Sequence, residues 1–124
     1  MSLHRTRIKL CGLSQPADVD HAVALGADAI GLVFYPPSPR FVATERAAEL
    51  ARRAGPFVTV TGLFVNASAD DIARVLDQVP LTLLQFHGDE TPEQCAEIAG
   101  KVGLPWLRAV RVQPGTDLVE FADR

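Results

Sequence analysis

The sequence predicts an α/β protein built on a parallel β-sheet with covering helices. Five short apolar segments alternate with five amphipathic stretches along the 124 residues. Such alternation is typical of parallel sheets, because two parallel strands can be joined only through a long crossover connection. The strand ends fall between Cys11 and Val110, so their mean spacing is about 25 residues, enough for one strand and its crossover helix.

The predicted strands are short and apolar, as expected where helices cover a parallel sheet. They cover Arg7–Cys11, Ala29–Phe34, Phe57–Val65, Leu81–Phe86 and Trp106–Val112. No linker, charge block or low-complexity segment interrupts their order. We therefore expect residues 1–124 to form a single domain.

Helix start signals follow each predicted strand. The predicted helices are Pro16–Leu25, Glu45–Ala54, Ala69–Gln78, a helix that begins at Pro92, and Gly115–Arg124. Hydroxyl side chains are favoured just before a helix, because they accept hydrogen bonds from the free N–H groups of its first turn. The expected N-cap residues are Ser14, Thr44, Ser68 and Thr91.

Composition excludes several classes of function. A chain that is 48% apolar is not disordered, and a net charge of −3 argues against nucleic acid or an anionic membrane surface as the main partner. The longest apolar run, from Ala29 to Tyr35, is far shorter than the roughly 20 residues of a membrane span. No apolar block follows the basic N-terminal residues, so a secretory signal is not expected. Two cysteines, Cys11 and Cys95, suit a reducing cytoplasm better than a disulfide framework.

Two architectures accommodate five βα units. A doubly wound, flavodoxin-like sheet of five strands closes at this length. A (β/α)8 barrel needs about 200 residues or more, so this chain would supply about the first five of its eight units. Length alone favours the doubly wound sheet, whereas the polar residues at the strand ends favour the barrel.

Polar and reactive side chains gather where the predicted strands end, which is where parallel α/β proteins carry their sites. Side chains alternate across a strand, so Lys9 and Cys11 share one face, as do Gln85 and His87. One rim of the sheet therefore carries an ammonium, a thiol, an amide and an imidazole. A cation close to a thiol favours its thiolate form, which makes Cys11 the candidate catalytic residue.

Each of these residues also has a purely structural interpretation. Cys11 could be a small buried hydrophobe, Lys9 could pair with a carboxylate, and His87 could be a hydrogen-bonded core histidine. Arg40 ends a stiff, proline-rich loop, and is either solvated or presented to a carboxylate or phosphate.

Other polar residues carry weaker signals. Cys95 is expected to fill the core, and Asp89 and Glu90 to place negative charge at the start of the next helix. No metal-ligand spacing, dinucleotide or phosphate loop, or serine nucleophile elbow is present, so neither a metal nor a cofactor is expected.

Four motifs, in order, resemble the phosphoribosylanthranilate isomerase family of tryptophan biosynthesis. Lys9–Gly12 resembles the family's KICG opening, and Gly26–Arg40 is similar to its GAD..GF.FYP.SPR segment. Gly62–Asn66 looks like GVFVN, and Leu84–Glu90 looks like VQLHGxE. With a fifth strand that is also similar, the resemblance covers nearly all of the chain.

The resemblance implies a (β/α)8 TIM barrel and a small phosphorylated substrate. The implied reaction is the Amadori rearrangement of N-(5-phosphoribosyl)anthranilate to 1-(o-carboxyphenylamino)-1-deoxyribulose 5-phosphate, without a cofactor. Cys11 would be the general base, and Arg40 would face the anthranilate carboxylate. Other implied roles are substrate binding by Gln85 and His87, and support by Lys9 and Asn66.

The family's general acid is an aspartate on a sixth strand, and its phosphate site follows the seventh and eighth strands. The predicted elements stop within the fifth unit. We therefore expect these 124 residues alone to be inactive, and to form a homo-oligomer through exposed barrel edges. The alternative function is a catalytically inactive partial barrel that self-associates or needs a complementing C-terminal segment.

Overall fold

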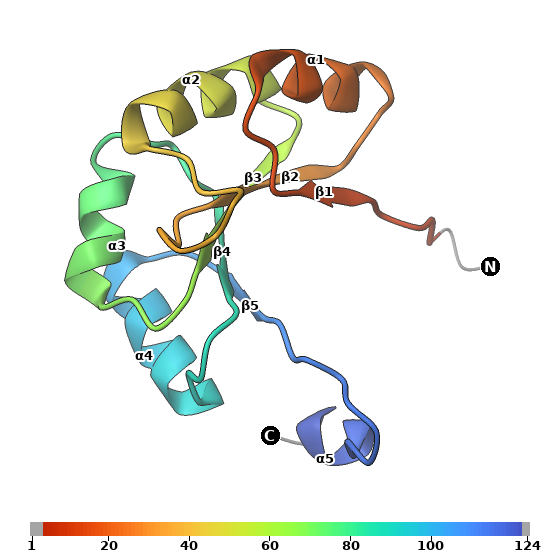
Figure 1. Cartoon of the computed structure of the whole chain (residues 1–124), viewed down its shortest axis with the longest axis vertical. Helices are drawn as coiled ribbons and strands as arrows, with labels where there is room; N and C mark the ends of the chain where they lie inside the picture. Colours follow the sequence, from red (N-terminus) through yellow and green to blue (C-terminus); the bar gives the residue numbers. More distant parts are fainter. Residues whose placement is uncertain (1–3, 123–124) are drawn as a thin grey trace.

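The computed structural model describes residues 4–122 and contains one parallel sheet with the strand order β1-β2-β3-β4-β5 (Figure 1). The strands are β1 (Lys9–Cys11), β2 (Ala29–Val33), β3 (Thr59–Phe64), β4 (Leu83–Phe86) and β5 (Trp106–Arg108). The helices are α1 (Pro16–Ala24), α2 (Thr44–Ala54), α3 (Ala69–Leu76), α4 (Pro92–Val102) and α5 (Leu118–Ala122). No described helix is long and apolar enough to cross a membrane.

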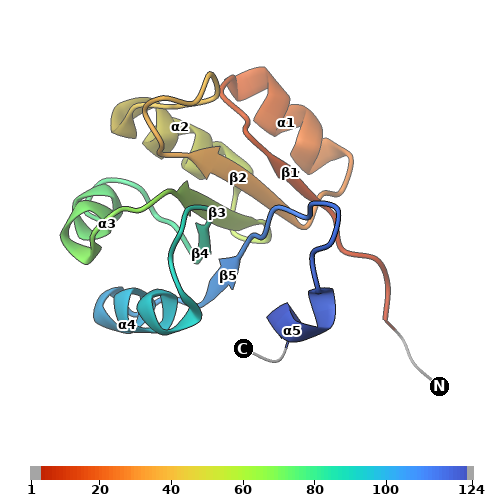
Figure 2. The ribbon, with the colours of Figure 1, turned by 60° about the horizontal axis from the view of Figure 1, so that its bottom comes forward.

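The strand order distinguishes between the two predicted architectures. Neighbouring strands are consecutive in sequence, the sheet curls, and α1 to α4 all lie outside the curve (Figure 2). A doubly wound sheet would reverse its strand order and carry helices on both faces. The flavodoxin-like alternative, which length alone favoured, is therefore wrong, and the fold is barrel-type with five βα units in the described residues.

The core lies between the sheet and its outer helices. Alternate residues of β2 and β4 point outward into it: Ile30, Leu32, Leu84 and Phe86 are all fully buried. Fully burying such a side chain contributes about 1.5–3 kcal/mol, so this layer supplies much of the stability. The intervening strand residues point to the concave side, where the polar side chains of β1 and β4 lie.

Two of the four predicted N-caps are confirmed. Ser68 Oγ accepts a hydrogen bond from the backbone N–H of Asp71 at 3.1 Å, and Thr91 Oγ1 accepts one from Gln94 at 3.1 Å. Both helices begin with complete capping boxes.

The other two predicted N-caps, Ser14 and Thr44, are wrong. The N-cap residues are Gln15 and Ala43, and neither uses a side-chain hydrogen bond. The proline after Gln15 forces that residue into extended backbone, so the boundary cannot lie one residue earlier. Thr44 is itself the first residue of α2.

The edge strands are shorter than predicted. β1 begins at Lys9 rather than Arg7, and β5 ends at Arg108 rather than Val112. Each has one partner strand, so its pairing stops where that partner's ladder stops. The predicted fifth helix is reduced to α5, and its predicted last two residues, 123 and 124, lie outside the described range.

The carboxylate of Asp28 links the N-terminal segment to the start of β2. Asp28, just before β2, accepts hydrogen bonds from Arg5 Nη1 at 3.0 Å and from the backbone N–H of Ile8 at 2.8 Å. Arg5 Nη2 makes a further ion-pair contact with the same carboxylate. The hydrogen bond from Arg5 is the main reason why the pKa of Asp28 falls from 3.8 to about 2, and the Ile8 N–H adds to it.

This shift predicts a pH-dependent effect of Asp28→Asn. The folded-state pKa lies below the ordinary value, so the ionised carboxylate stabilises the fold above about pH 4, and this stability is lost as the pH falls through 2. The variant should lower the free energy of unfolding at pH 7, measured in urea, and match the wild type at about pH 1.5. Asp77→Asn, at the exposed C-cap of α3, is the control and should not lower stability. An equal loss at both pH values would contradict this role.

Candidate active site

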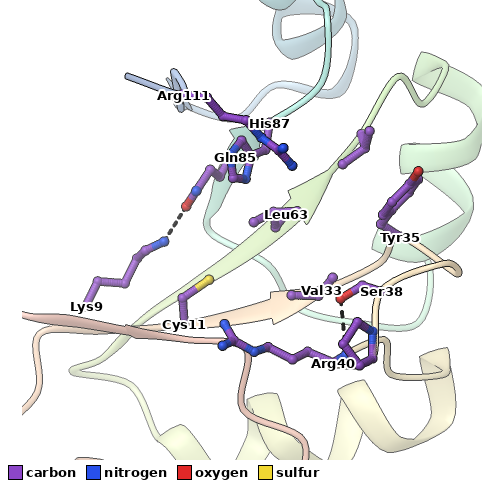
Figure 3. Close-up of a pocket in the computed structure, with 12 residues that line it drawn as sticks. Lys9, Cys11, Val33, Tyr35, Ser38, Arg40, Leu63, Gln85, His87 and Arg111 are labelled. Carbon is purple, nitrogen blue, oxygen red and sulfur yellow. Dashed lines mark hydrogen bonds between the residues drawn. The ribbon is translucent and has the colours of Figure 1, made fainter. Parts of the chain in front are cut away.

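A cavity of about 660 Å³ opens on the concave side of the sheet, at the carboxyl ends of the strands (Figure 3). Its polar lining comes from well-separated parts of the sequence: Lys9, Cys11, Tyr35, Ser38, Arg40, Gln85, His87 and Arg111. The predicted shared rim of Lys9, Cys11, Gln85 and His87 is therefore present. The structure also brings in Arg40, which is remote from them in the sequence.

Strand pairing explains how β1 and β4 contribute to the same cavity. Gln85 is in register with Leu63 on β3, and Cys11 is in register with Gly31 on β2. Lys9 Nζ donates a hydrogen bond to Gln85 Oε1, which joins the two strands across the cavity (Figure 3). The half-buried ammonium thus has an amide oxygen as its partner rather than the carboxylate that the structural interpretation anticipated.

The position of the Cys11 thiol depends on a glycine in the neighbouring strand. A Cβ on Gly31 would lie 2.7 Å from Cys11 Sγ and 3.1 Å from Cys11 Cα. The thiol therefore leans over β2 in space that only glycine leaves open. Its other side faces the cavity, where it is partly accessible to solvent.

The second cysteine has a different environment. Cys95 is fully buried in the core, as predicted for a filler residue. Burial is the main cause that raises the pKa of its thiol, and the nearby charge of Glu90 adds to the effect. Cys11 is therefore the candidate reactive thiol, and Cys95 is a buried thiol that can serve as an internal control.

The loop after β2 presents Arg40 to the cavity. Its backbone N–H bonds to Ser38 Oγ at 3.1 Å, and Ser38 N–H bonds to the carbonyl of Tyr35 at 2.9 Å. The Arg40 side chain lies against Gly12, where a Cβ would collide with it. Figure 3 shows the guanidinium pointing toward Cys11.

The cavity is cationic. Of the described residues that line it, Lys9, Arg40 and Arg111 carry positive charge and none is acidic. Guanidinium and ammonium groups recognise carboxylates and phosphates through charge-assisted hydrogen bonds. The lining therefore suits an anionic small molecule. No group of three or more described His, Cys, Asp or Glu residues could hold a metal ion.

Asn66 lies beside this cavity rather than within its lining. It adjoins a second hollow of about 420 Å³, which shares His87 and Arg111 with the first. Its backbone has a positive φ of 53°, which asparagine tolerates better than most residues. Its side-chain Oδ1 accepts a hydrogen bond from the backbone N–H of Asp89 at 2.9 Å, so Asn66 shapes the rim of the site.

Two features of the site were missed by the sequence-based predictions. Arg111 falls within the predicted fifth strand but was not assigned to the site, although alternation from Leu107 would place it on the cavity side. Glu90 was expected only to add charge at a helix start, yet it is 5% exposed and accepts two backbone hydrogen bonds. No pattern in the sequence distinguishes a buried carboxylate there from a solvated one.

A curled parallel sheet with outer helices and polar side chains at its carboxyl ends places the fold in the α/β-barrel class. The chain belongs to the N-(5'-phosphoribosyl)anthranilate isomerase family, which matches residues 8–124. It is 94% identical over 124 residues to the isomerase of Ralstonia nicotianae, and 62% identical over 122 residues to that of Leptothrix cholodnii. The two matches cover 100% and 98% of this chain but 54% of each relative. The chain therefore spans about half the length of these relatives.

Solved structures of the same family have the same fold. The phosphoribosyl anthranilate isomerase of Thermotoga maritima superposes with a TM-score of 0.81 at 38% identity, covering 87% of this chain and 52% of that one. A phosphoribosyl anthranilate isomerase in complex with reduced 1-(o-carboxyphenylamino)-1-deoxyribulose 5-phosphate gives a TM-score of 0.84 at 34% identity, covering 96% and 59%.

Gly31→Ala should displace the Cys11 thiol. The added methyl group would occupy the space into which Sγ leans, so the thiol must move further into the cavity. We expect Cys11 to react with iodoacetamide about threefold faster or more, measured by peptide mass spectrometry, while Cys95 remains unreacted. Gly100→Ala is the matched control, because a Cβ there meets no atom within 4 Å. An unchanged alkylation rate would contradict this packing.

Proposed function

We propose that this chain carries the general base and much of the substrate-binding surface of an N-(5'-phosphoribosyl)anthranilate isomerase. The enzyme would convert N-(5-phosphoribosyl)anthranilate to 1-(o-carboxyphenylamino)-1-deoxyribulose 5-phosphate in tryptophan biosynthesis. The observation that carries the proposal is that Cys11, Arg40, Gln85 and His87 line one cavity. Family membership and the complex of a relative with a reduced product analogue support it.

The rearrangement needs an acid and a base at different atoms of the substrate. The acid protonates the ribose ring oxygen and opens the ring to a Schiff base. The base then removes the C2 proton, and the resulting enolamine becomes the ketone. Cys11 is the candidate base, because its thiol faces the cavity from β1 and is held in place over Gly31.

The remaining polar groups would bind the substrate. Arg40 would hold the anthranilate carboxylate with its planar guanidinium. Gln85 Oε1 accepts from Lys9, which leaves the amide N–H groups of Gln85 as donors toward the cavity. Lys9 would therefore support Gln85, and Asn66 would support the rim next to His87. Val33 and Leu63 add apolar wall on which an aromatic ring can pack.

The proposed activity belongs to these five units together with the rest of a barrel. The resemblance assigns the general acid to a sixth strand and the phosphate site to later loops, and the described residues contain five strands. The two free cysteines suit the reducing cytoplasm as the location.

The second candidate function is a partial barrel that self-associates. It is favoured by apolar side chains that are exposed on the edge strands, with Leu10 37% and Leu107 47% exposed. Unpaired strand edges are ready templates for association.

One experiment separates the two functions. The 124-residue chain is compared with the same chain joined to the C-terminal segment of the Ralstonia nicotianae relative. Anthranilate fluorescence reports turnover, and light scattering reports mass. We expect the joined protein to turn over substrate, and the chain alone to be inactive and larger than a monomer. A folded but inactive joined protein would contradict the proposed function, and a stable monomer would contradict association.

Cys11→Ser in the joined protein should reduce kcat by about 10²- to 10⁴-fold, since a general base typically contributes that much. The fold should be retained, as judged by circular dichroism. Cys95→Ala is the control, because that thiol lies in the core and should leave kcat nearly unchanged. A loss of less than threefold in Cys11→Ser would argue against Cys11 as the base.

In the joined protein, Arg40→Ala should mainly raise the KM for the substrate. A guanidinium that binds the carboxylate equally in the ground and transition states contributes uniform binding, so kcat changes little. Loss of one charge-assisted contact corresponds to about a 10- to 100-fold increase in KM. Arg46→Ala, on the exposed face of α2, is the control. A large fall in kcat with an unchanged KM would instead assign Arg40 to the chemistry.

A further inference from the structure

Glu90 joins two of the loops that surround the candidate active site. It lies between β4 and α4, and only 5% of the residue is exposed. Its Oε2 accepts a hydrogen bond from the backbone N–H of Asn66 at 2.8 Å, and its Oε1 accepts one from the backbone N–H of Gly88 at 2.8 Å. One carboxylate therefore binds the loop after β3 and the loop after β4.

These two loops approach each other more closely than side chains normally allow. A Cβ on Gly88 would lie 2.9 Å from the backbone nitrogen of Asn66. Asn66 itself adopts a positive φ of 53°, a conformation that costs free energy for a residue other than glycine. Such a backbone conformation persists only where surrounding contacts hold it. Glu90 accepts one hydrogen bond from Asn66 and one from Gly88, the two residues that approach each other.

The backbone of Glu90 is also linked to a third strand. Arg108 at the end of β5 donates from Nε to the backbone carbonyl of Glu90 at 2.9 Å. Burying a carboxylate is costly unless it is hydrogen-bonded and compensated by charge. The Glu90 carboxylate has an N–H donor on each oxygen, and the guanidinium of Arg108 holds the backbone of the same residue.

His87 is the residue through which this arrangement reaches the cavity. It directly precedes Gly88, and its backbone N–H bonds to the carbonyl of Phe64 at 3.0 Å. The imidazole lines the cavity, whereas Glu90 does not. We propose that Glu90 is a positioning residue: it attaches the loops after β3 and β4 to each other and so holds His87 where the substrate binds. This inference rests on the proposed function.

Glu90→Gln tests the inference with little change in volume. A carboxylate accepts hydrogen bonds on both oxygens, whereas the amide presents an NH₂ group to one of the two backbone donors. Glu97→Gln is the matched control, because Glu97 lies exposed on α4 and pairs only with Lys101 Nζ at 3.4 Å among the ion pairs of the described residues.

The first measurement is backbone amide exchange by NMR in the 124-residue chain. We expect the Asn66 and Gly88 amides to exchange about tenfold faster in Glu90→Gln, with amides in β2 unchanged. Unchanged exchange at both amides would overturn the attachment of the loops.

The second measurement uses the joined protein, at a temperature where all variants are fully folded. We expect Glu90→Gln to raise KM, and the Kd of the reduced product analogue, by about tenfold while kcat falls less. A purely structural role would lower the melting temperature without this split, and that result would overturn the inference. If the unmodified joined protein neither turns over substrate nor binds the analogue, the proposed function fails, and the amide exchange still decides the loop attachment.

Discussion

The in-register pairing of consecutive parallel strands is the constraint on which the other features depend. Because side chains alternate along each strand, the pairing divides all five strands into one outward and one inward set at once. The outward set, with Ile30 and Phe86, packs against helices. The inward set brings Cys11 and Gln85 to one cavity. If one strand shifted by one residue, its core side chains would face the cavity and its cavity side chains would face the helices. The hydrophobic core and the candidate active site are therefore specified by the same register.

Three glycines then determine where the functional groups lie on the concave side of the sheet. Gly31 leaves room for the Cys11 thiol, Gly12 for the Arg40 side chain, and Gly88 for the backbone of Asn66. In each case the missing Cβ lies beside a residue of the candidate site rather than in a solvent-exposed turn. The glycines near the cavity thus act through the space they leave open; Gly12 also adopts a φ of 82°, so its substitution would strain the backbone as well as move Arg40.

The sequence was sufficient for features with a local or periodic cause. The strand and helix order, the capping by Ser68 and Thr91, and the shared face of Lys9 and Cys11 all follow from spacing. Features that depend on three-dimensional proximity were not predictable. The burial of Glu90 requires two loops to meet, and the bond between Lys9 and Gln85 joins residues 76 positions apart. Alternation alone could not separate the barrel from the doubly wound sheet, because both share it; the family resemblance predicted the barrel, and the strand order confirms it.

The positive charge of the cavity bears on which proton transfers its lining residues can perform. Its described lining offers a thiol and an imidazole among Lys9, Arg40 and Arg111, with no carboxylic acid. A carboxylate placed beside three cations would be held in its ionised form, and so would be a poor proton donor. An acid that must protonate a ring oxygen therefore works better away from this wall. In the proposed reaction the base acts at C2 and the acid at the ring oxygen, which are different atoms of the substrate. The cationic wall formed by these five units is thus suited to binding anions, and under the proposed function the acid would come from a sixth strand, as the family resemblance implies.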